Sequence, residues 1–389
     1  MRVCIVGSSK RFFSGITTHT IFLANALAKR NQVSVILLRK LLPRFLFPGR
    51  GRVGKDQYSI DFAPGIEVYD GMDYNSPLSW LRAYRFLKQQ KPEVIIMQWW
   101  SSSVAHMQLF LKWANSVNIK AKMILDMHEV VDPLEESIMP IRLYSRVIGR
   151  RLVRGLDAYI THSESAKSQV ARTYKIDDDT ISVIQMGLYE DYRQPMDKAL
   201  AKEELGTGEE FIILYFGLIR HYKGVPCLVK AFDLLPSPIA SRSRLLIVGE
   251  VWDEGELLQE LIDSSSHKSQ ISLVPHYVPD SMIPRYFAAA DVVALPYLRA
   301  AGSGVAHIAM AYGKPLIVSD VEALRESMAD YQGALFFPPG DHSALRDKLL
   351  QVREAVGSEK EAYYPPPQRT WDDIAQRYEA VLNKIVSEK

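Results

Sequence analysis

The chain of 389 residues is longer than one ordinary hydrophobic core requires, so its length favours two domains. Hydrophobic residues make up 47% and charged residues 24%, which excludes disordered, fibrous and membrane-spanning classes. The net charge of +2 hides an asymmetry, since residues 1–190 carry 26 basic and 17 acidic side chains and the rest carry 21 and 28. The basic half favours an anionic partner.

Short β-rich apolar runs alternate with segments of helical period along the chain, which is typical of βαβ units and parallel sheets. The strands expected in the first half are Arg2–Gly7, Val33–Leu38, Val94–Gln98, Met123–His128, Ala158–His162 and Ser182–Met186. Those expected in the second half are Phe211–Phe216, Leu245–Gly249, Ile271–Val274, Val292–Leu295, Leu316–Ser319 and Ala334–Phe337. The pattern predicts an α/β chain with two Rossmann-like, doubly wound parallel-sheet domains.

The polar stretch Leu188–Lys202 predicts the boundary between a domain over 1–190 and a domain over 195–365. After the prolines at 365–367, Trp371–Ile385 has the spacing of an amphipathic helix, and we expect this helix, within 370–387, to pack on the first domain. The N-terminus turns polar by Ser8, too early for a secretory signal, and no apolar run approaches the roughly 20 residues of a bilayer span. A cytoplasmic protein is therefore expected.

Ligands of open parallel sheets bind at the carboxyl ends of the strands, so the residues that follow each strand are candidates. After the first strand, a helix beginning at Gly15 and Ile16 would offer backbone amides to a phosphate or a sugar hydroxyl. A plain tight turn explains this loop equally well, and the loop is not the G-x-G-x-x-G of dinucleotide oxidoreductases. His128 ends another strand and could hydrogen-bond a sugar hydroxyl, although a single histidine there is more often structural.

Two loops of the second half suit an anionic ligand. Arg220 and Lys223 lie three residues apart beside Gly224, where they can converge on a diphosphate. The loop after the strand that ends at Leu295 leads into a new helix, whose first amides and a serine hydroxyl would bind phosphate oxygens. The residues of this second anion site are Gly302, Ser303, Gly304 and Val305.

Together these segments resemble the family 4 glycosyltransferases of the retaining GT-B class, and the resemblance runs over nearly the whole chain. Each matching segment is weak by itself, but their order and spacing are specific. They are Gly15–Ile16 opening a helix that ends in ANALA at 24–28, FGLIRHYKG at 216–224, LLIVGE at 245–250, YFAAADVVALPY at 286–297 and AMAYGKPLIVSD at 309–320.

The resemblance implies two domains that face each other across a cleft, with a nucleotide diphosphate sugar bound mainly by the second and an acceptor bound by the first. In such enzymes Arg220 and Lys223 would neutralise the diphosphate, the amides around Ser303 would hold its distal phosphate, and His128 would contact the transferred sugar. These implied roles make His128, Arg220 and Lys223 the expected catalytic residues. The leaving phosphate is thought to help deprotonate the acceptor, so no metal or other cofactor is expected.

The sequence departs from the family pattern at three positions. The two glutamates that usually flank the phosphate loop are Ala300 and Ile308 here, and the arginine often found after the glycine of the basic turn is Leu218. Arg220 would take the place of that arginine. A subset of the family shares the Ser-Gly-Val loop without the glutamates. Their loss leaves open a catalytically silent homologue that binds glycan or a partner transferase, whereas a nucleotide-sugar epimerase fits less well.

The basic first half points to the acceptor. Leu41–Lys55 mixes basic and large apolar side chains and could lie on an anionic membrane surface, although a solvated loop is an equal alternative. If residues 142–154 are helical, Arg142, Arg146, Arg150 and Arg154 form one basic stripe. We therefore expect hexose transfer with retention to a glycan or lipid-linked acceptor, in cell-surface polysaccharide or glycolipid synthesis at the inner face of the membrane. Nucleic acid is not expected, since no groove-reading motif accompanies the charge.

Overall fold

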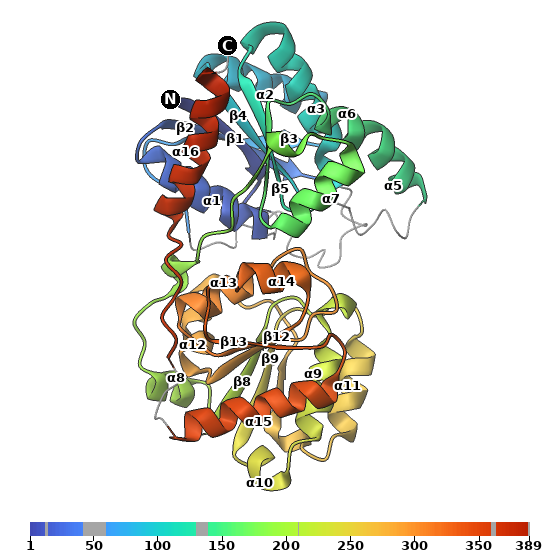
Figure 1. Ribbon diagram of the computed structural model, residues 1–389, viewed down its shortest axis with the longest axis vertical. Coiled ribbons are helices and arrows are strands. Elements are labelled where there is room, and N and C mark those ends of the chain that lie inside the picture. The colour runs from blue at the N-terminus through green and yellow to red at the C-terminus, as the bar shows by residue number, and fades with distance from the viewer. Residues whose placement is uncertain (12–14, 42–59, 130–138, 209, 359–362, 388–389) are drawn as a thin grey trace. The chain divides into compact units, whose positions relative to one another are not determined.

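The computed structural model describes residues 1–11, 15–41, 60–129, 139–208, 210–358 and 363–387. The chain forms two compact units: unit 1 comprises Met1–Gly187 and Arg369–Lys389, and unit 2 comprises Leu188–Gln368. Each unit has its own parallel sheet with helices packed against it (Figure 1). The expected α/β architecture with two Rossmann-like sheets is thereby confirmed.

The sheet of unit 1 has seven parallel strands in the order β3-β2-β1-β4-β5-β6-β7. Its strands are β1 (Arg2–Ser8), β2 (Gln32–Lys40), β3 (Glu67–Asp73), β4 (Val94–Trp99), β5 (Lys122–Met127), β6 (Ala158–Thr161) and β7 (Ile181–Val183). Neighbouring side chains of the central strand point to opposite faces, so Val3 and Ile5 enter one core while Cys4 and Val6 enter the other. Burial on both faces explains why these strands read as continuous apolar runs.

Helices cover both faces of this sheet. The helices of unit 1 are α1 (Gly15–Ala28), α2 (Pro77–Gln90), α3 (Ala105–Ala114), α5 (Met139–Tyr144), α6 (Arg150–Val153), α7 (Glu164–Tyr174) and α16 (Trp371–Ser387). The C-terminal helix α16 lies beside α1 and buries Ile374, Tyr378 and Leu382 in the core that contains Ile5 (Figure 1). The apolar stripe of this helix is thus removed from water by the first strands of the chain.

Two expectations for unit 1 are corrected. The strand β3 was not predicted; it is an edge strand whose first residues are partly exposed and whose pairing with β2 is irregular. The strands expected over Met123–His128 and Ala158–His162 are each shorter, since β5 ends at Met127 and β6 ends at Thr161. Both histidines therefore lie just beyond a strand end.

The arginine stripe expected over 142–154 depends on one continuous helix. A π-helical turn at Ser145–Gly149 separates α5 from α6, and Arg154 is already extended. The segment is therefore not a single α-helix through Arg154. The side chains of Arg142 and Arg146 lie outside the described residues, so the stripe itself stays a prediction.

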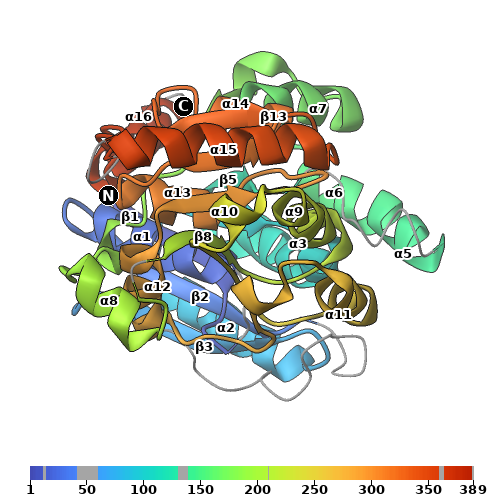
Figure 2. The same ribbon diagram turned by 90° about the horizontal axis from the view of Figure 1, so that it is seen from below.

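The sheet of unit 2 has six parallel strands in the order β10-β9-β8-β11-β12-β13. They are β8 (Phe211–Phe216), β9 (Ser243–Val248), β10 (Ile271–Val274), β11 (Val292–Leu295), β12 (Leu316–Ser319) and β13 (Ala334–Phe337), so all six expected strands are confirmed. Its helices are α8 (Lys198–Glu204), α9 (Val225–Asp233), α10 (Ser237–Ala240), α11 (Gly255–Ser264), α12 (Ile283–Ala289), α13 (Gly304–Ala311), α14 (Glu322–Ser327) and α15 (His342–Ser358). The long helix α15 packs against α9, as Figure 2 shows from below.

The sequence predicted that no segment spans a membrane and that two basic segments could bind a membrane surface. Among the described helices, none is long and apolar enough to cross a membrane. The basic segment Leu41–Lys55 lies, beyond Leu41, outside the described residues, and so do the side chains of Arg142 and Arg146. Leu41 itself is buried in the core of unit 1.

Candidate functional site

The basic turn of unit 2, residues 220–224, is held in place by backbone pairing. After β8 ends, the Ile219 amide donates to the Glu250 carbonyl at 2.9 Å, and the Trp252 amide donates back to the Ile219 carbonyl at 3.0 Å. A 3₁₀ turn over His221–Lys223 follows directly. The two predicted cations, Arg220 and Lys223, thus flank a short turn at the carboxyl edge of the sheet, where doubly wound folds bind ligands.

Gly224 brings this turn against a second loop, residues 296–303, which we call the Ser303 loop. The backbone of Gly224 has a φ of +63°, and a Cβ added to Gly224 would lie 2.0 Å from the Pro296 carbonyl oxygen. The Leu298 amide donates to the Tyr222 carbonyl at 2.8 Å and fixes the contact. Only glycine can occupy this left-handed position at such close approach.

Lys223 and Ser303 both contact one buried tyrosine, Tyr297. The Lys223 ammonium is 3.6 Å from the centre of the Tyr297 ring, and the Tyr297 hydroxyl is 3.3 Å from the Ser303 hydroxyl oxygen. Burial raises the pKa of Tyr297 to about 12, so the ring stays neutral beneath the cation. The tyrosine thereby holds the lysine and the first residues of α13 at the same edge of the sheet.

Ser303 is the N-cap of α13. Its hydroxyl oxygen accepts a hydrogen bond from the Ala306 amide at 3.3 Å, which satisfies one of the amides at the helix start. The hydroxyl proton can still be donated, and the amides of Gly304 and Val305 belong to the first turn, which has no intrahelical acceptor for them. This arrangement suits an anion.

Arg220 is stacked between two aromatic rings. Its guanidinium carbon is 5.3 Å from the centres of the Tyr222 and Trp252 rings, and its Nε is 3.6 Å from an Asp253 carboxylate oxygen. The side chain is 34% exposed. The guanidinium carbon of Arg299 also lies over the Tyr222 ring, 5.7 Å from its centre. Arg299 is thus a third cation at this place, and it was not predicted from the sequence.

Apolar side chains occupy the positions of the two missing glutamates. Ile308 lies on α13 and is 6% exposed, and Ala300 lies on the Ser303 loop before the helix. Neither side chain can accept a hydrogen bond from a ribose or hexose hydroxyl. Such contacts must therefore be absent or be made by other residues.

In unit 1, Gly15 and Ile16 stand at the start of α1, as expected for an amide-presenting helix end. Residues 12–14 of the preceding loop lie outside the described residues. No atom of the described chain lies within 4 Å of a Cβ built on Gly15. The described neighbours therefore leave room for a side chain at this position.

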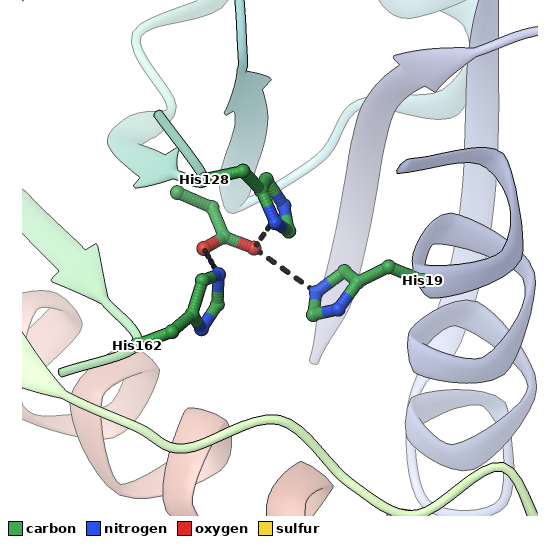
Figure 3. A group of neighbouring side chains, drawn as sticks. His19, His128 and His162 are labelled. Carbon is green, nitrogen blue, oxygen red and sulfur yellow. Dashed lines mark ion pairs between the residues drawn. The ribbon is translucent and has the colours of Figure 1, made fainter. Parts of the chain in front are cut away.

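His128 does not stand alone but belongs to a histidine cluster formed by His19, Asp126, His128 and His162 (Figure 3). Its amide donates to the Trp99 carbonyl at 2.8 Å, and its side chain is 6% exposed. Burial holds the pKa of His128 well below its usual range, so the imidazole is neutral. Burial alone would raise the pKa of Asp126, but the surrounding histidines and the hydrogen bonds from His162 and His19 hold it well below its usual range.

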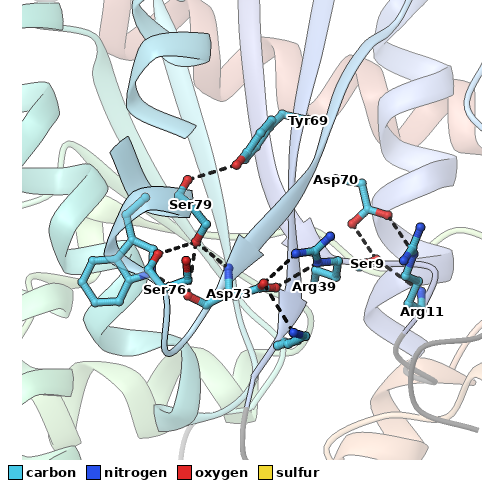
Figure 4. A network of polar contacts seen from close by, with 10 residues as sticks. Ser9, Arg11, Arg39, Tyr69, Asp70, Asp73, Ser76 and Ser79 are labelled. Carbon is cyan, nitrogen blue, oxygen red and sulfur yellow. Dashed lines mark hydrogen bonds and ion pairs between the residues drawn. The ribbon is translucent and has the colours of Figure 1, made fainter. Parts of the chain in front are cut away.

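A second polar group lies at the carboxyl ends of β1, β2 and β3 (Figure 4). Asp73 accepts from Arg39 Nε at 3.0 Å and from Arg39 Nη2 at 2.6 Å. Asp70 accepts from the Ser9 hydroxyl at 2.8 Å and lies 3.7 Å from Arg11 Nε. Arg11 is 50% exposed, so its guanidinium also faces solvent. Carboxylates thus hold cations in place at this edge of unit 1.

Several residues of these sites were missed by sequence analysis. In the histidine cluster, His162 follows a strand as His128 does, so the same rule could have found it, and Asp126 is a charged residue inside an apolar run. His19 and Tyr378 give no such signal, because the fold alone brings them together across the chain. In unit 2, Tyr297 was part of a quoted segment but had no role assigned.

A pocket of about 660 Å³ in unit 2 lies away from these residues. Its lining includes Asp291, which precedes β11, and Gly313 and Lys314, which precede β12, so the pocket lies at the amino ends of the strands. The basic turn and the Ser303 loop follow the carboxyl ends of β8 and β11. Ligands of this fold bind at the carboxyl edge, and we assign the site there.

Comparison with known proteins identifies the family of both halves of the chain. Residues 197–365 match the family described as glycosyl transferases group 1, and residues 13–191 match glycosyltransferase family 4. A D-inositol 3-phosphate glycosyltransferase of Mycobacteroides abscessus is 27% identical over 233 residues, which are 58% of this chain and 51% of that protein. The O-antigen chain mannosyltransferase B of Escherichia coli is 26% identical over 212 residues, 53% and 55% of the two chains. These alignments span about half the length of each relative.

Solved structures share the fold over the whole chain. Sucrose-phosphate synthase from Thermosynechococcus elongatus has a TM-score of 0.74 and 16% identity, with both chains fully covered. Anabaena HepE, solved in complex with UDP and glucose, has a TM-score of 0.66 and 16% identity, with 100% of this chain and 99% of that chain covered. The chain therefore belongs to the family 4 type of glycosyltransferases and has the GT-B fold.

Proposed function

We propose that this protein transfers a hexose, with retention, from a nucleotide diphosphate sugar to a glycan or lipid-linked acceptor. One observation carries the proposal: the basic turn and the Ser303 loop are joined through Gly224, Tyr297 and a backbone hydrogen bond. Two cations and one helix N-terminus thus share the carboxyl edge of unit 2. A diphosphate is the ligand that such a set of point charge, guanidinium and backbone amides recognises.

In the proposed reaction, unit 2 stabilises the charge that develops on the departing nucleotide diphosphate. Arg220 and Lys223 would neutralise the two phosphates, and the amides of Gly304 and Val305, with the Ser303 hydroxyl, would hold the distal one. These groups are fixed before the ligand arrives, so little reorganisation is needed as charge develops. We propose that the transfer step itself uses no divalent cation, and that the leaving phosphate helps to deprotonate the acceptor.

Unit 1 supplies the acceptor side of the proposal. His128 would donate a hydrogen bond to a sugar hydroxyl, and Gly15 and Ile16 would present the start of α1 to the donor. An anionic acceptor is supported by Arg11 and Arg39 at the carboxyl ends of the first strands (Figure 4) and by relatives named for D-inositol 3-phosphate. A lipid-linked acceptor in polysaccharide or glycolipid synthesis would place the protein at an anionic membrane surface.

The first experiment is calorimetric titration of the protein with UDP, GDP and their hexose conjugates. Saturable binding of one nucleotide, followed by turnover with retained anomeric configuration in the NMR spectrum of the product, is the expected result. The absent glutamates at Ala300 and Ile308 favour one other function, a catalytically silent homologue that binds glycan or a partner transferase. Failure of every nucleotide to bind would support that function and contradict a donor site in unit 2.

A further inference from the structure

The histidine cluster of unit 1 has a composition that sugar transfer does not explain. His19 comes from α1, Asp126 is within β5, and His128 and His162 follow β5 and β6. Their side chains converge, as Figure 3 shows, and are 0–9% exposed. One nitrogen from each ring and one carboxylate oxygen all lie within 4.8 Å of one another. A single sugar-binding histidine would need neither of the other two.

The distances in the cluster match the spacing of ligands around one metal ion. The Nε2 atoms of His19 and His128 lie 3.3 and 3.7 Å from Asp126 Oδ2, and the Nε2 atom of His162 lies 3.2 Å from the other carboxylate oxygen, Oδ1. Four ligands at about 2.0–2.1 Å from a tetrahedral ion are separated by about 3.3–3.4 Å. The ring centres are 4.5, 4.5 and 5.4 Å apart, and such an ion would separate them by about 5 Å.

The hydrogen bonds of His162 sharpen this argument. Its Nδ1 lies 2.9 Å from the Ile184 carbonyl oxygen, which can only accept, so Nδ1 carries the proton. Nε2 then faces an Asp126 carboxylate oxygen at 3.2 Å, and either a proton or a metal ion must lie between these two atoms. Among the described residues, this Nε2, the His128 Nε2 and one Asp126 oxygen have no hydrogen-bond partner. Lone pairs that face one another in a buried site repel, and a cation between them removes the repulsion.

The surroundings also resemble those of a metal centre. The Ile184 carbonyl orients the His162 ring, and the Tyr378 hydroxyl donates to an Asp126 oxygen at 2.8 Å. Metal-bound imidazoles and carboxylates are commonly oriented by such outer hydrogen bonds. The Trp371 ring lies edge-on to His19, with ring centres 5.1 Å apart, and closes the cluster on the side of α16.

We propose that His19, Asp126, His128 and His162 form a closed binding site for one transition-metal ion of the zinc class. Three imidazoles and one carboxylate suit Zn²⁺ and its neighbours better than Mg²⁺ or Ca²⁺, which prefer oxygen ligands. The ion would tie α1 to the ends of β5 and β6, and through Tyr378 to α16. His128 would bind it through Nε2 and keep the Nδ1 proton for a sugar hydroxyl. The site differs from the proposed transfer chemistry, which uses no divalent cation.

The test measures metal binding and not activity. Protein stripped with chelator is titrated with Zn²⁺, and Co²⁺ is added separately as a coloured probe. We expect one equivalent of Zn²⁺ to bind and to raise the melting temperature, and Co²⁺ to give the intense visible absorption of four-coordinate sites. His162→Gln should weaken Zn²⁺ binding by about 100-fold or more. His106→Gln, at a partly buried histidine of unit 1 outside the cluster, should leave it unchanged.

Two results would overturn the proposal. If folded wild-type protein binds neither ion, or binds Zn²⁺ no more tightly than His162→Gln does, the cluster is a protonated His162 paired with the Asp126 carboxylate. If Co²⁺ binds with the weak spectrum of an octahedral aqua complex, the ion lies elsewhere on the surface. The Co²⁺ spectrum needs no variant, so it decides the matter even if His162→Gln fails to fold. Nucleotide binding by unit 2 is measured separately and does not depend on either result.

Discussion

The two units use charge at the carboxyl edges of their sheets in opposite ways. In unit 2, Arg220 is one-third exposed and is stacked on aromatic rings, so its charge remains available to a ligand. In unit 1, His19 and Asp126 are essentially inaccessible, and the polar atoms of the histidine cluster face one another. The comparison shows that a strand end can serve either a ligand from solution or the interior of the protein, and that burial distinguishes the two.

The largest expected effect is a loss of stability from a substitution in the buried histidine cluster of unit 1. Asp126→Ala leaves three imidazoles and the Tyr378 hydroxyl around a missing acceptor, so it should lower the free energy of unfolding by about 3–5 kcal/mol. Asp61→Ala removes a carboxylate of the same unit that is 74% exposed, and should cost less than about 1 kcal/mol. Denaturant unfolding of both variants measures the difference. Equal losses would show that the cluster is not a stabilising centre.

Gly224→Ala tests the packing of the two loops in unit 2. The added methyl would meet the Pro296 carbonyl oxygen and occupy a left-handed backbone, which should cost about 3 kcal/mol. Nucleotide affinity should fall with it, because the basic turn must move away from the Ser303 loop. Gly206→Ala is the control, since that glycine also has positive φ but no neighbour within 4 Å. A variant at Gly224 as stable as its control would contradict the close contact.

Arg220→Ala and Lys223→Ala test the two half-buried cations directly. Each removes a proposed charge-assisted contact to the diphosphate and should weaken nucleotide binding by about 1.5–3 kcal/mol. Each also removes a cation–π contact, so the free energy of unfolding should fall by about 0.5–1 kcal/mol. Lys268→Ala, at the amino end of β10, supplies the control for nonspecific charge. Nucleotide affinity is measured by titration calorimetry. Unchanged affinity in both variants would show that the phosphates do not bind at this edge of the sheet.

His128→Ala should lower turnover about tenfold, or about 1.4 kcal/mol, while nucleotide affinity stays near that of the wild type. The reason is that the proposed contact is with the transferred sugar. His162→Gln separates this role from the integrity of the cluster, because it disturbs the cluster without removing the imidazole of His128. If His128→Ala and His162→Gln lower turnover equally, the loss comes from disturbing the histidine cluster and not from a missing contact between His128 and the sugar. Steady-state kinetics with measured nucleotide affinity give the answer.

The smallest effect concerns a buried carboxylate in unit 2. Asp291 is bound by Lys198 at 2.8 Å, Lys202 at 2.9 Å and the Ile212 amide at 2.8 Å. Burial alone would raise its pKa, but these partners hold the pKa below its usual range. The stabilisation is therefore present above about pH 4 and is lost as pH falls through the folded pKa. Asp291→Asn should lower the free energy of unfolding by about 1 kcal/mol at neutral pH, and calorimetry at decreasing pH should find that this difference shrinks below about pH 4.

The sequence predicted the strands of unit 2 well because buried parallel strands are short apolar runs between glycine and proline signals. It failed at β3, where an edge strand begins with Glu67 and contains Gly71, and at the π turn of Ser145–Gly149, which no residue pattern marks. Arg220 and Lys223 could be found because they are neighbours in sequence. The pairing of Tyr222 with Leu298, and of His19 with Asp126, depends on tertiary packing and could not.

The position of α16 in unit 1 has a consequence for biosynthesis. Residues 369–387 enter the first core only after the ribosome has made all of unit 2, so unit 2 can fold while unit 1 still lacks Tyr378 and Trp371. Until then, the Asp126 carboxylate and the His19 ring are without the partners that cover them. The nascent chain therefore carries an incomplete first core for most of its synthesis, a period in which chaperones can recognise it.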